Sequence, residues 1–574
     1  MVGQGPDHDV VIVGGGPVGM MLAIELGRRD VDVLVVERRE SRLRHPRAVG
    51  VHPRTMEIFR QLGMADEVRQ AGGLPLDEWH TVGFMTRLTT PEIGRIDLVG
   101  GPDGVAAALE ISPELTAWCA QDILEPLLRE RAAKLPSVRV AYGLRATGVR
   151  QNADGVTVTT AHERTGEETQ FSARYLVGAD GGRSTVRKSV GIDAPRSRTL
   201  SHQMNVCFEA DLRPYMGDRK HILWWIVNPE TQGTFLTYDG DMTWVYSWNY
   251  DPERENPGDY SPERCVEVIR SAIGTDDDVD ISLVGLFPWT IDSALADRFQ
   301  EGRVLLVGDA AHRLPPTGGF GMNSGIQDAQ NLAWKLDAVL RGQAGPGLLA
   351  TYAEERRAVA AGNIEQALTT AAASMRASWL SYDAERLGNI EKPEGAADRQ
   401  RIADNLDGQE PQYSTYGQQF GVVYESAAVV PDGTAPEPST VTEYRPSARP
   451  GAHAPHRWLR TRSGERVSTV DLLHSRFVVL ATPEGRAWLD AVPDVAAELG
   501  LGIGAFTIGT GGDLTDEDGG PAWWSRYGIG PTGVLLVRPD GHVAFRAADA
   551  EGGGRPPAAV LTAALRRVLH LGDL

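Results

Sequence analysis

The residues near the N-terminus best suited to chemistry are three glycines, Gly14, Gly16 and Gly19, which follow the apolar run 9–13. Gly14 permits a sharp turn out of a strand, Gly16 lets a pyrophosphate approach the backbone, and Gly19 lets a helix pack closely on that strand. The N-terminus of the helix expected over 20–28 offers free N–H groups and a partial positive charge to phosphates. Strand, glycines and helix occur in the order that predicts a dinucleotide-binding site.

A carboxylate follows the second apolar run, 31–36, at Glu37. It lies about 20 residues beyond the glycines, where an acid accepts a hydrogen bond from an adenosine ribose 2′-hydroxyl. A 2′-phosphate would be repelled there, so the site is expected to bind FAD or NAD and not NADP.

Two later segments bear on the choice between these dinucleotides. In 176–187 an apolar run ends at Asp180 and Gly181, and in 303–312 a similar run ends at Asp309, before a glycine-rich turn and a helical stretch. A carboxylate at a strand end beside such a helix start can bind a sugar-like chain and an electron-rich ring edge together. A flavin has both, a ribitol and an isoalloxazine, whereas NAD has no ribitol, so FAD is favoured.

Composition and charge exclude several classes of protein. The chain of 574 residues is too long for one core, and 41% hydrophobic with 23% charged residues is typical of a globular protein. A net charge of −20 argues against nucleic acid or an anionic membrane as the partner, and three cysteines without C-x-x-C spacing argue against disulfide scaffolds and cysteine metal sites. The polar N-terminus leaves no room for a signal peptide, and no apolar run approaches the roughly 20 residues that span a bilayer, so a cytoplasmic location is expected.

The three motifs, in this order, resemble those of the class A (group A) FAD-dependent aromatic hydroxylases, a family of flavoprotein monooxygenases. The resemblance is close over 8–365 and weaker beyond. Within the family the chain is most similar to the three-domain phenol, chlorophenol and aromatic-polyketide hydroxylases, in particular through the segment 321–336.

The resemblance implies roles for individual residues. Glu37 would bind the adenosine ribose and Asp309 the ribitol, while Asp180 would lie in a groove for the pyrophosphate and the nicotinamide donor. The backbone N–H groups of 321–323 would face the pyrimidine edge of the flavin, where a helix N-terminus stabilises negative charge on the reduced ring.

Two residues are expected to act in catalysis by the same resemblance. Pro315 would place its carbonyl beside the flavin, and Arg47 would influence the reactivity of the ring. Without the resemblance, Arg47 and Gln121 would be interpreted as ordinary surface or capping residues. The residues expected to bind the cofactor are Gly14, Gly16, Pro17, Gly19, Glu37, Arg38, Arg47, Gln121, Asp180, Gly181, Asp309, Pro316, Gly319, Gly321, Met322 and Asn323. No residue is expected to bind a metal.

The region 190–290 alternates apolar and polar residues and is rich in aromatic ones, which predicts an antiparallel sheet with one buried face. In the family that the chain resembles, this sheet covers the flavin and lines the substrate pocket. Core packing would select the same aromatic residues as substrate contact. The candidates for substrate contact are Trp224, Phe235, Trp248 and Trp289.

The expected fold is α/β, with a Rossmann-like FAD-binding domain interleaved with a mixed or antiparallel β-sheet substrate domain. The FAD-binding domain is expected over 1–189 and 291–400, and the substrate domain over 190–290, joined by 75–115. A proline-punctuated linker, 401–457, and a thioredoxin-like C-terminal domain, 458–574, would follow. That domain has no C-x-x-C and is expected to have a structural or oligomerisation role.

The resemblance implies an enzyme that keeps FAD bound, while NADH or NADPH docks transiently because no second nucleotide motif is evident. The reduced flavin and O2 would form a C4a-hydroperoxide that hydroxylates a phenolic or polycyclic aromatic molecule, such as a polyketide in antibiotic biosynthesis. The alternatives are a Baeyer–Villiger or epoxidising flavin monooxygenase, and a flavoprotein oxidase, dehydrogenase or non-catalytic FAD-binding protein. The expected partner is a small aromatic substrate, and neither nucleic acid nor a membrane is expected as a partner. Whether the chain forms a homo-oligomer is left open.

Overall fold

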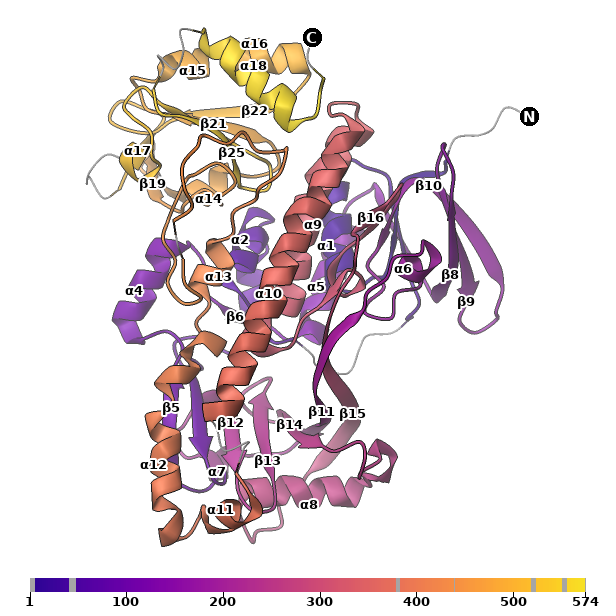
Figure 1. The fold of residues 1–574 in the computed structure, drawn as a ribbon, viewed down its shortest axis with the longest axis vertical. Coiled ribbons are helices and arrows are strands. Elements are labelled where there is room, and N and C mark those ends of the chain that lie inside the picture. The colour runs from indigo at the N-terminus through magenta and orange to yellow at the C-terminus, as the bar shows by residue number, and fades with distance from the viewer. Residues whose placement is uncertain are drawn as a thin grey trace.

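The structure is a computed structural model that describes residues 6–40, 48–377, 382–437, 439–517, 523–549 and 555–572. Its mixed α/β fold contains two eight-stranded sheets and a four-stranded sheet near the C-terminus (Figure 1). None of the helices in these ranges is both long and apolar enough to cross a membrane.

The first sheet has the N-terminal strand at its centre. Its order is β16 (Gln300–Glu301), β17 (Val304–Leu306), β10 (Glu168–Gly178), β1 (His8–Val13), β2 (Val33–Glu37) and β7 (Val138–Tyr142), and β8 (Leu144–Gln151) and β9 (Val156–His162) extend it from β10. From β17 to β7 the neighbouring strands are parallel. Parallel strands need cover on both faces, which explains why β1, β2 and β17 are almost entirely apolar and buried.

Three helices that pack around the first sheet are α1 (Pro17–Gly27), α5 (Gln121–Ala133) and α9 (Phe320–Leu340), and α1 contacts both of the others. The helix expected over 20–28 therefore starts earlier, at Pro17, a residue that suits the first turn because its missing N–H would have had no partner there.

The second sheet is antiparallel except where β12 and β4 run parallel. Its order is β18 (His312–Arg313), β15 (Ser282–Leu295), β11 (Arg196–Glu209), β14 (Thr243–Tyr250), β13 (Gln232–Thr237), β12 (His221–Val227), β4 (Thr81–Met85) and β5 (Glu92–Asp97). Side chains of α8 (Pro262–Ile273) pack in one core cluster with its aromatic residues.

The C-terminal unit is built on the four-stranded sheet β22 (Ile503–Thr507), β21 (Phe477–Ala481), β24 (Val534–Val537) and β25 (Val543–Ala547). β21 and β22 are parallel and the other pairs antiparallel, with α15 (Arg486–Asp490), α16 (Val492–Leu499) and α18 (Pro557–Val568) beside them, in agreement with a thioredoxin-like fold. Its core includes Trp334 of α9, so the C-terminal unit packs against one of the helices that surround the first sheet.

The long helix α10 (Ala350–Ala377) follows α9 in the chain and packs against it. The other helices and strands are β3 (Gly50–Val51), α2 (Pro53–Gln61), α3 (Ala65–Gly72), α4 (Gly101–Ile111), β6 (Ala117–Trp118), α6 (Thr185–Ser189), α7 (Arg213–Met216), α11 (Ala384–Asn389), α12 (Ala396–Asp404), α13 (Tyr416–Phe420), β19 (Trp458–Thr461), β20 (Arg466–Ser468), α14 (Thr469–Leu472), β23 (Leu514–Asp516) and α17 (Trp523–Arg526).

Candidate active site

Four of the expected residues lie at the same edge of the first sheet. Gly14, Glu37, Asp180 and Asp309 are at or just beyond the carboxyl ends of β1, β2, β10 and β17, which are neighbouring parallel strands. In open α/β sheets this edge is where ligands bind. Residues far apart in the sequence therefore surround one candidate site.

The three N-terminal glycines have different surroundings. Gly14 has φ +113°, and a Cβ there would lie 2.3 Å from the carbonyl oxygen of Ala179, while a Cβ at Gly19 would lie 2.0 Å from the carbonyl oxygen of Gly14. A Cβ at Gly16 would meet no atom within 4 Å beyond its two chain neighbours. Gly14 and Gly19 thus permit close packing, whereas Gly16 leaves an open surface at the N-terminus of α1, which suits a pyrophosphate.

Glu37 is held beside this turn. Its Oε2 accepts a hydrogen bond of 2.6 Å from the N–H of Gly15, and its Oε1 accepts one of 2.8 Å from the N–H of Arg39. A carboxylate has about four acceptor positions, so these two bonds leave capacity for a ribose hydroxyl. The neighbouring Arg38 is exposed, and Pro17 is buried in the first turn of α1.

Asp180 caps a helix. Its Oδ1 accepts a hydrogen bond of 2.5 Å from the Ser184 hydroxyl, and its Oδ2 accepts bonds from the N–H groups of Thr185 and Val186 at 2.7 and 3.1 Å. Burial raises the pKa of this carboxyl above its usual value, although these hydrogen bonds oppose the shift. Asp180 therefore fastens the start of α6 to the sheet edge, beside Gly181, a local role that the sequence did not reveal.

Asp309 is exposed, although its neighbours in the turn, Gly308 and Ala310, are buried. The preceding Gly308 donates its N–H to Oδ2 of Asp328 at 3.1 Å, and the ring of His312, only 1% exposed, bonds to the same oxygen at 2.7 Å. The side of the turn that includes Asp309 is exposed. This arrangement presents a carboxylate at the edge of the sheet.

The N-terminus of α9 has open backbone N–H groups. Gly318 and Gly319 have φ of +79° and +72°, and no side chain caps the helix. A Cβ at Gly321 would meet no atom within 4 Å outside the backbone of its own helix and its chain neighbours, and the next residue, Met322, is half-buried. Uncapped N–H groups and the partial positive charge of a helix start suit an electron-rich ring edge.

Asn323 and His52 hold that turn in place. The Asn323 side chain accepts the N–H of His52 at 3.0 Å and donates to the carbonyls of Gly50 and Gly319 at 3.0 and 2.8 Å. The His52 ring Nε2 lies 2.8 Å from the carbonyl oxygen of Gly318 and must donate, because a carbonyl only accepts. Burial lowers the pKa of His52 to about 4, so the ring is neutral near pH 7. No sequence signal pairs His52 with Gly318.

Close packing brings the three motifs together. Gly325 of α9 lies against α1 and the Gly308 turn, since a Cβ there would be 2.4 Å from Cγ2 of Val18 and 3.2 Å from Cα of Gly308. The N-termini of α1 and α9 and the Asp309 turn therefore border one region. No side chain projects from Gly16 or Gly321, and the surface left open at these two positions fits a flavin dinucleotide.

The remaining cofactor and catalytic candidates have varied surroundings. Gln121 is half-buried, and its side chain donates to Oε1 of Glu125 at 2.7 Å. Pro315 is buried and Pro316 exposed. Arg47 lies outside the described residues.

The four aromatic candidates do not share one face of the second sheet. Trp224 and Phe235 are fully buried and Trp248 is 7% exposed, and all three lie in the core cluster that contains α8 side chains. Trp289 is 41% exposed, and its neighbour on the same face, Phe287, packs with Val49 and Ala120 from the region of the first sheet. The geometry therefore favours core packing for the first three and leaves Trp289 on the face turned toward the candidate site.

Comparison with known proteins agrees with this geometry. Residues 7–367 match the model of an FAD-binding domain family, and residues 447–570 match the C-terminal domain of aromatic-ring hydroxylases. The chain is 38% identical to the aklavinone 12-hydroxylase RdmE of Streptomyces purpurascens, over 98% of this chain and 99% of that one. It is 34% identical to the 2,4-dichlorophenol 6-monooxygenase of Delftia acidovorans, over 98% of each chain.

A solved structure has the same fold throughout. The crystal structure of the flavin-dependent monooxygenase PieE, in complex with FAD and substrate, superposes with a TM-score of 0.89 at 34% identity, over 99% of this chain and 100% of that one. The expectation of a flavin hydroxylase is thereby confirmed. The chain belongs to the family of FAD-dependent aromatic hydroxylases, flavoprotein monooxygenases that use O2 and a reduced nicotinamide nucleotide.

Proposed function

We propose that this hydroxylase acts on phenolic polycyclic aromatic molecules of the polyketide type. The observation that carries the proposal is the 38% identity, along nearly the whole of both chains, to an enzyme named for hydroxylating aklavinone. The relative named for 2,4-dichlorophenol makes a single-ring phenol the second candidate, at 34% identity.

The arrangement of the chain supports a division of labour at the site. Bound FAD would supply the redox chemistry, taking a hydride from NADH or NADPH and activating O2. The N-terminus of α1, open at Gly16, would bind the pyrophosphate, while Glu37 and Asp309 would accept hydrogen bonds from the ribose and ribitol hydroxyls. The N–H groups at Gly321 and Asn323 would stabilise negative charge on the reduced ring.

The second sheet would cover the ring and the substrate. Trp289 and Phe287 lie on the face turned toward the first sheet, together with the buried Tyr238 and Cys207. Such an aromatic and largely apolar wall would stack a flat substrate and exclude water from the reacting atoms. Pro315 and Arg47 remain proposals for residues that influence the flavin.

Incubation of the purified protein with FAD, labelled O2 and either nicotinamide nucleotide tests the proposal. The substrates are polycyclic phenols, with 2,4-dichlorophenol in parallel, and products are read by mass spectrometry. We expect one labelled oxygen on a ring carbon of a polycyclic phenol. Turnover of 2,4-dichlorophenol alone would favour the second candidate, an ester or epoxide product would indicate the alternative oxygenations, and peroxide as the product of every substrate would contradict the proposal.

We also propose that the protein works in the cytoplasm, where reduced nicotinamide nucleotides are available. Recovery of the enzyme in the membrane fraction after cell lysis would contradict this.

A further inference from the structure

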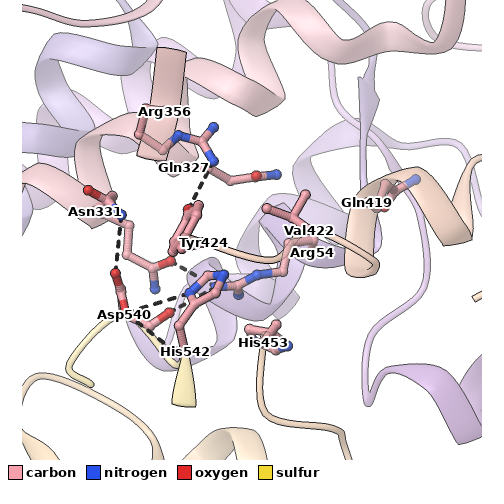
Figure 2. Close-up of a pocket in the computed structure, with 11 residues that line it drawn as sticks. Arg54, Gln327, Asn331, Arg356, Gln419, Val422, Tyr424, His453, Asp540 and His542 are labelled. Atoms are coloured by element: carbon pink, nitrogen blue, oxygen red, sulfur yellow. Dashed lines mark hydrogen bonds and ion pairs between the residues drawn. The ribbon is translucent and has the colours of Figure 1, made fainter. Parts of the chain in front are cut away.

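The turn between β24 and β25 is buried against helices α9 and α10 (Figure 2). Arg538 at its start is 0% exposed and bonds to both carboxylate oxygens of Glu355 on α10, at 2.6 and 2.9 Å. Lys335 on α9 bonds to the same carboxylate at 2.7 Å, and Trp334 donates to Oδ2 of Asp540 at 3.1 Å. We call Arg538, Glu355, Lys335 and Asp540 the anchoring branch, because it fastens the C-terminal unit to α9 and α10.

A second set of contacts runs from the same turn toward Asp309. His542 stacks on Tyr424 with ring centroids 4.1 Å apart, and the Tyr424 hydroxyl accepts a bond of 3.0 Å from Nη1 of Arg356 on α10. Nε of Arg356 donates to Oδ1 of Asp328 on α9 at 2.7 Å. The other oxygen of Asp328 accepts the N–H of Gly308, next to Asp309. We call His542, Tyr424, Arg356 and Asp328 the flavin branch.

The flavin branch is buried throughout. Asp328 is 0% exposed, Arg356 1%, Tyr424 3% and His542 5%. Burial alone would raise the pKa of Asp328, yet His312 and Arg356 hold it below its usual value, so the carboxylate is charged. A buried charge needs its partners, since losing one leaves the other uncompensated. The positions of Arg356 and Asp328 therefore depend on each other.

The space where the branches meet is not a ligand site. Residues of both branches, with Arg54 and His453, surround a cavity of about 10 Å³ (Figure 2). That volume corresponds to about one water molecule and excludes an organic ligand. The cluster is thus a packed joint between units.

We infer that the C-terminal unit positions the FAD-binding turn, through Tyr424, Arg356 and Asp328, which hold the Gly308 peptide and hence the direction of Asp309. This rests on the proposed binding of the FAD ribitol by Asp309. Tyr424 and Arg356 are then positioning residues, and a thioredoxin-like unit without cysteines acts on the cofactor as a mechanical support.

Two variants of one segment test the inference. Tyr424→Phe keeps the ring on His542 and removes the hydroxyl that bonds Arg356. Ser426→Ala removes a hydroxyl that donates to Oε1 of Glu355 at 2.6 Å, in the anchoring branch. Each variant loses one hydrogen bond to a charged group, and Ser426→Ala also loses the bond of 3.2 Å that its hydroxyl accepts from the N–H of Ala428. The melting temperature of the apoprotein should therefore fall at least as far in Ser426→Ala as in Tyr424→Phe.

FAD affinity separates the two variants. We expect Tyr424→Phe to raise the Kd for FAD about tenfold, measured by flavin fluorescence, and Ser426→Ala to leave it unchanged. A Kd in Tyr424→Phe equal to that of the wild type, or raised equally in both variants, would overturn the inference. Arg356→Lys is a second variant that tests the same prediction for the Kd of FAD, because a lysine cannot bond Asp328 and Tyr424 in the same forked geometry.

A double variant separates this inference from the assignment of Asp309. If Asp309 binds the ribitol, Asp309→Asn alone lowers the affinity for FAD. Tyr424→Phe then lowers that affinity less when it is added to Asp309→Asn than when it is made in the wild type. Full additivity would contradict the proposed route through Asp309. Normal FAD affinity in Asp309→Asn alone would overturn the ribitol assignment, whatever Tyr424→Phe does.

Discussion

Gly16 and Gly19 belong to one motif, and the structure predicts opposite consequences for replacing them. Gly16→Ala should leave the stability of the apoprotein unchanged, because its Cβ meets no atom within 4 Å beyond its chain neighbours and its φ is −75°. The same Cβ would occupy the space expected for the pyrophosphate, so FAD affinity should fall at least tenfold. Thermal unfolding of the apoprotein and titration with FAD measure the two effects.

Gly19→Ala is the matched comparison. A Cβ there would lie 2.0 Å from the carbonyl oxygen of Gly14, and a backbone atom cannot move aside cheaply. Overpacking of this kind typically costs about 1–3 kcal/mol, so the apoprotein itself should be destabilised. A Gly16→Ala protein that binds FAD as the wild type does would contradict the assignment of the pyrophosphate to this turn.

Asp309 has an exposed position at the end of β17, so its replacement tests binding more than folding. Asp309→Ala should lose bound FAD, because the ribitol hydroxyls lose a charged acceptor. The flavin absorbance per mole of purified protein measures this, with circular dichroism as the control for the fold. Normal flavin content would reject the ribitol assignment.

At the scale of elements, the start of α9 depends on a residue from another part of the chain. His52 precedes α2 and holds the Gly318 carbonyl, so the left-handed turn before α9 is tied to its ring. The neutral ring is favoured in the folded state, where the pKa of His52 is about 4, against about 6.5 for an unperturbed histidine.

The stability contributed by His52 should therefore be complete above pH 6.5 and be lost as the pH falls toward 4. The difference corresponds to at most about 3 kcal/mol in the free energy of unfolding. Denaturant unfolding of wild type and His52→Gln between pH 7 and pH 4 checks this, and the variant should lose less stability on acidification. Parallel pH profiles for the two proteins would show that the His52 ring does not titrate in this way.

At the scale of the whole molecule, buried charge joins the C-terminal unit to the rest. Arg538→Met should lower the free energy of unfolding by about 3–5 kcal/mol, because buried Asp540 would lose the guanidinium that it pairs with and buried Glu355 would keep only Lys335 as a charged partner. Lys134→Met removes an exposed pair with Glu130 and should leave unfolding unchanged. Urea unfolding of both variants measures the contrast, and similar curves for the two would mean that this joint adds little.

Much of the fold followed from local patterns in the sequence. The glycine spacing and apolar runs predicted the strand, turn and helix around Gly14, which the structure has as β1, the Gly14 turn and α1. The mixed α/β class and the family are confirmed, whereas the domain limits and the roles of individual residues remain predictions. Local patterns suffice here because a turn or a strand depends on neighbours in the chain.

The aromatic residues show where such reasoning stops. Alternation predicted a sheet with one buried face, but it does not tell which face meets the first sheet. Trp224 and Phe235 turned out to pack with α8, and Trp289 lies on the other face. Only the packing of the two sheets decides that difference.

The sequence by itself predicted a dinucleotide site that begins at Gly14, with carboxylates at strand ends, and it determined that the C-terminal unit has no cysteine for redox chemistry. The tertiary structure decided the partners across long separations: His52 with Gly318, Asp328 with Gly308 and Arg356, and Arg538 with Glu355. Buried polar groups must find partners wherever the chain brings them, and spacing along a sequence does not encode that meeting.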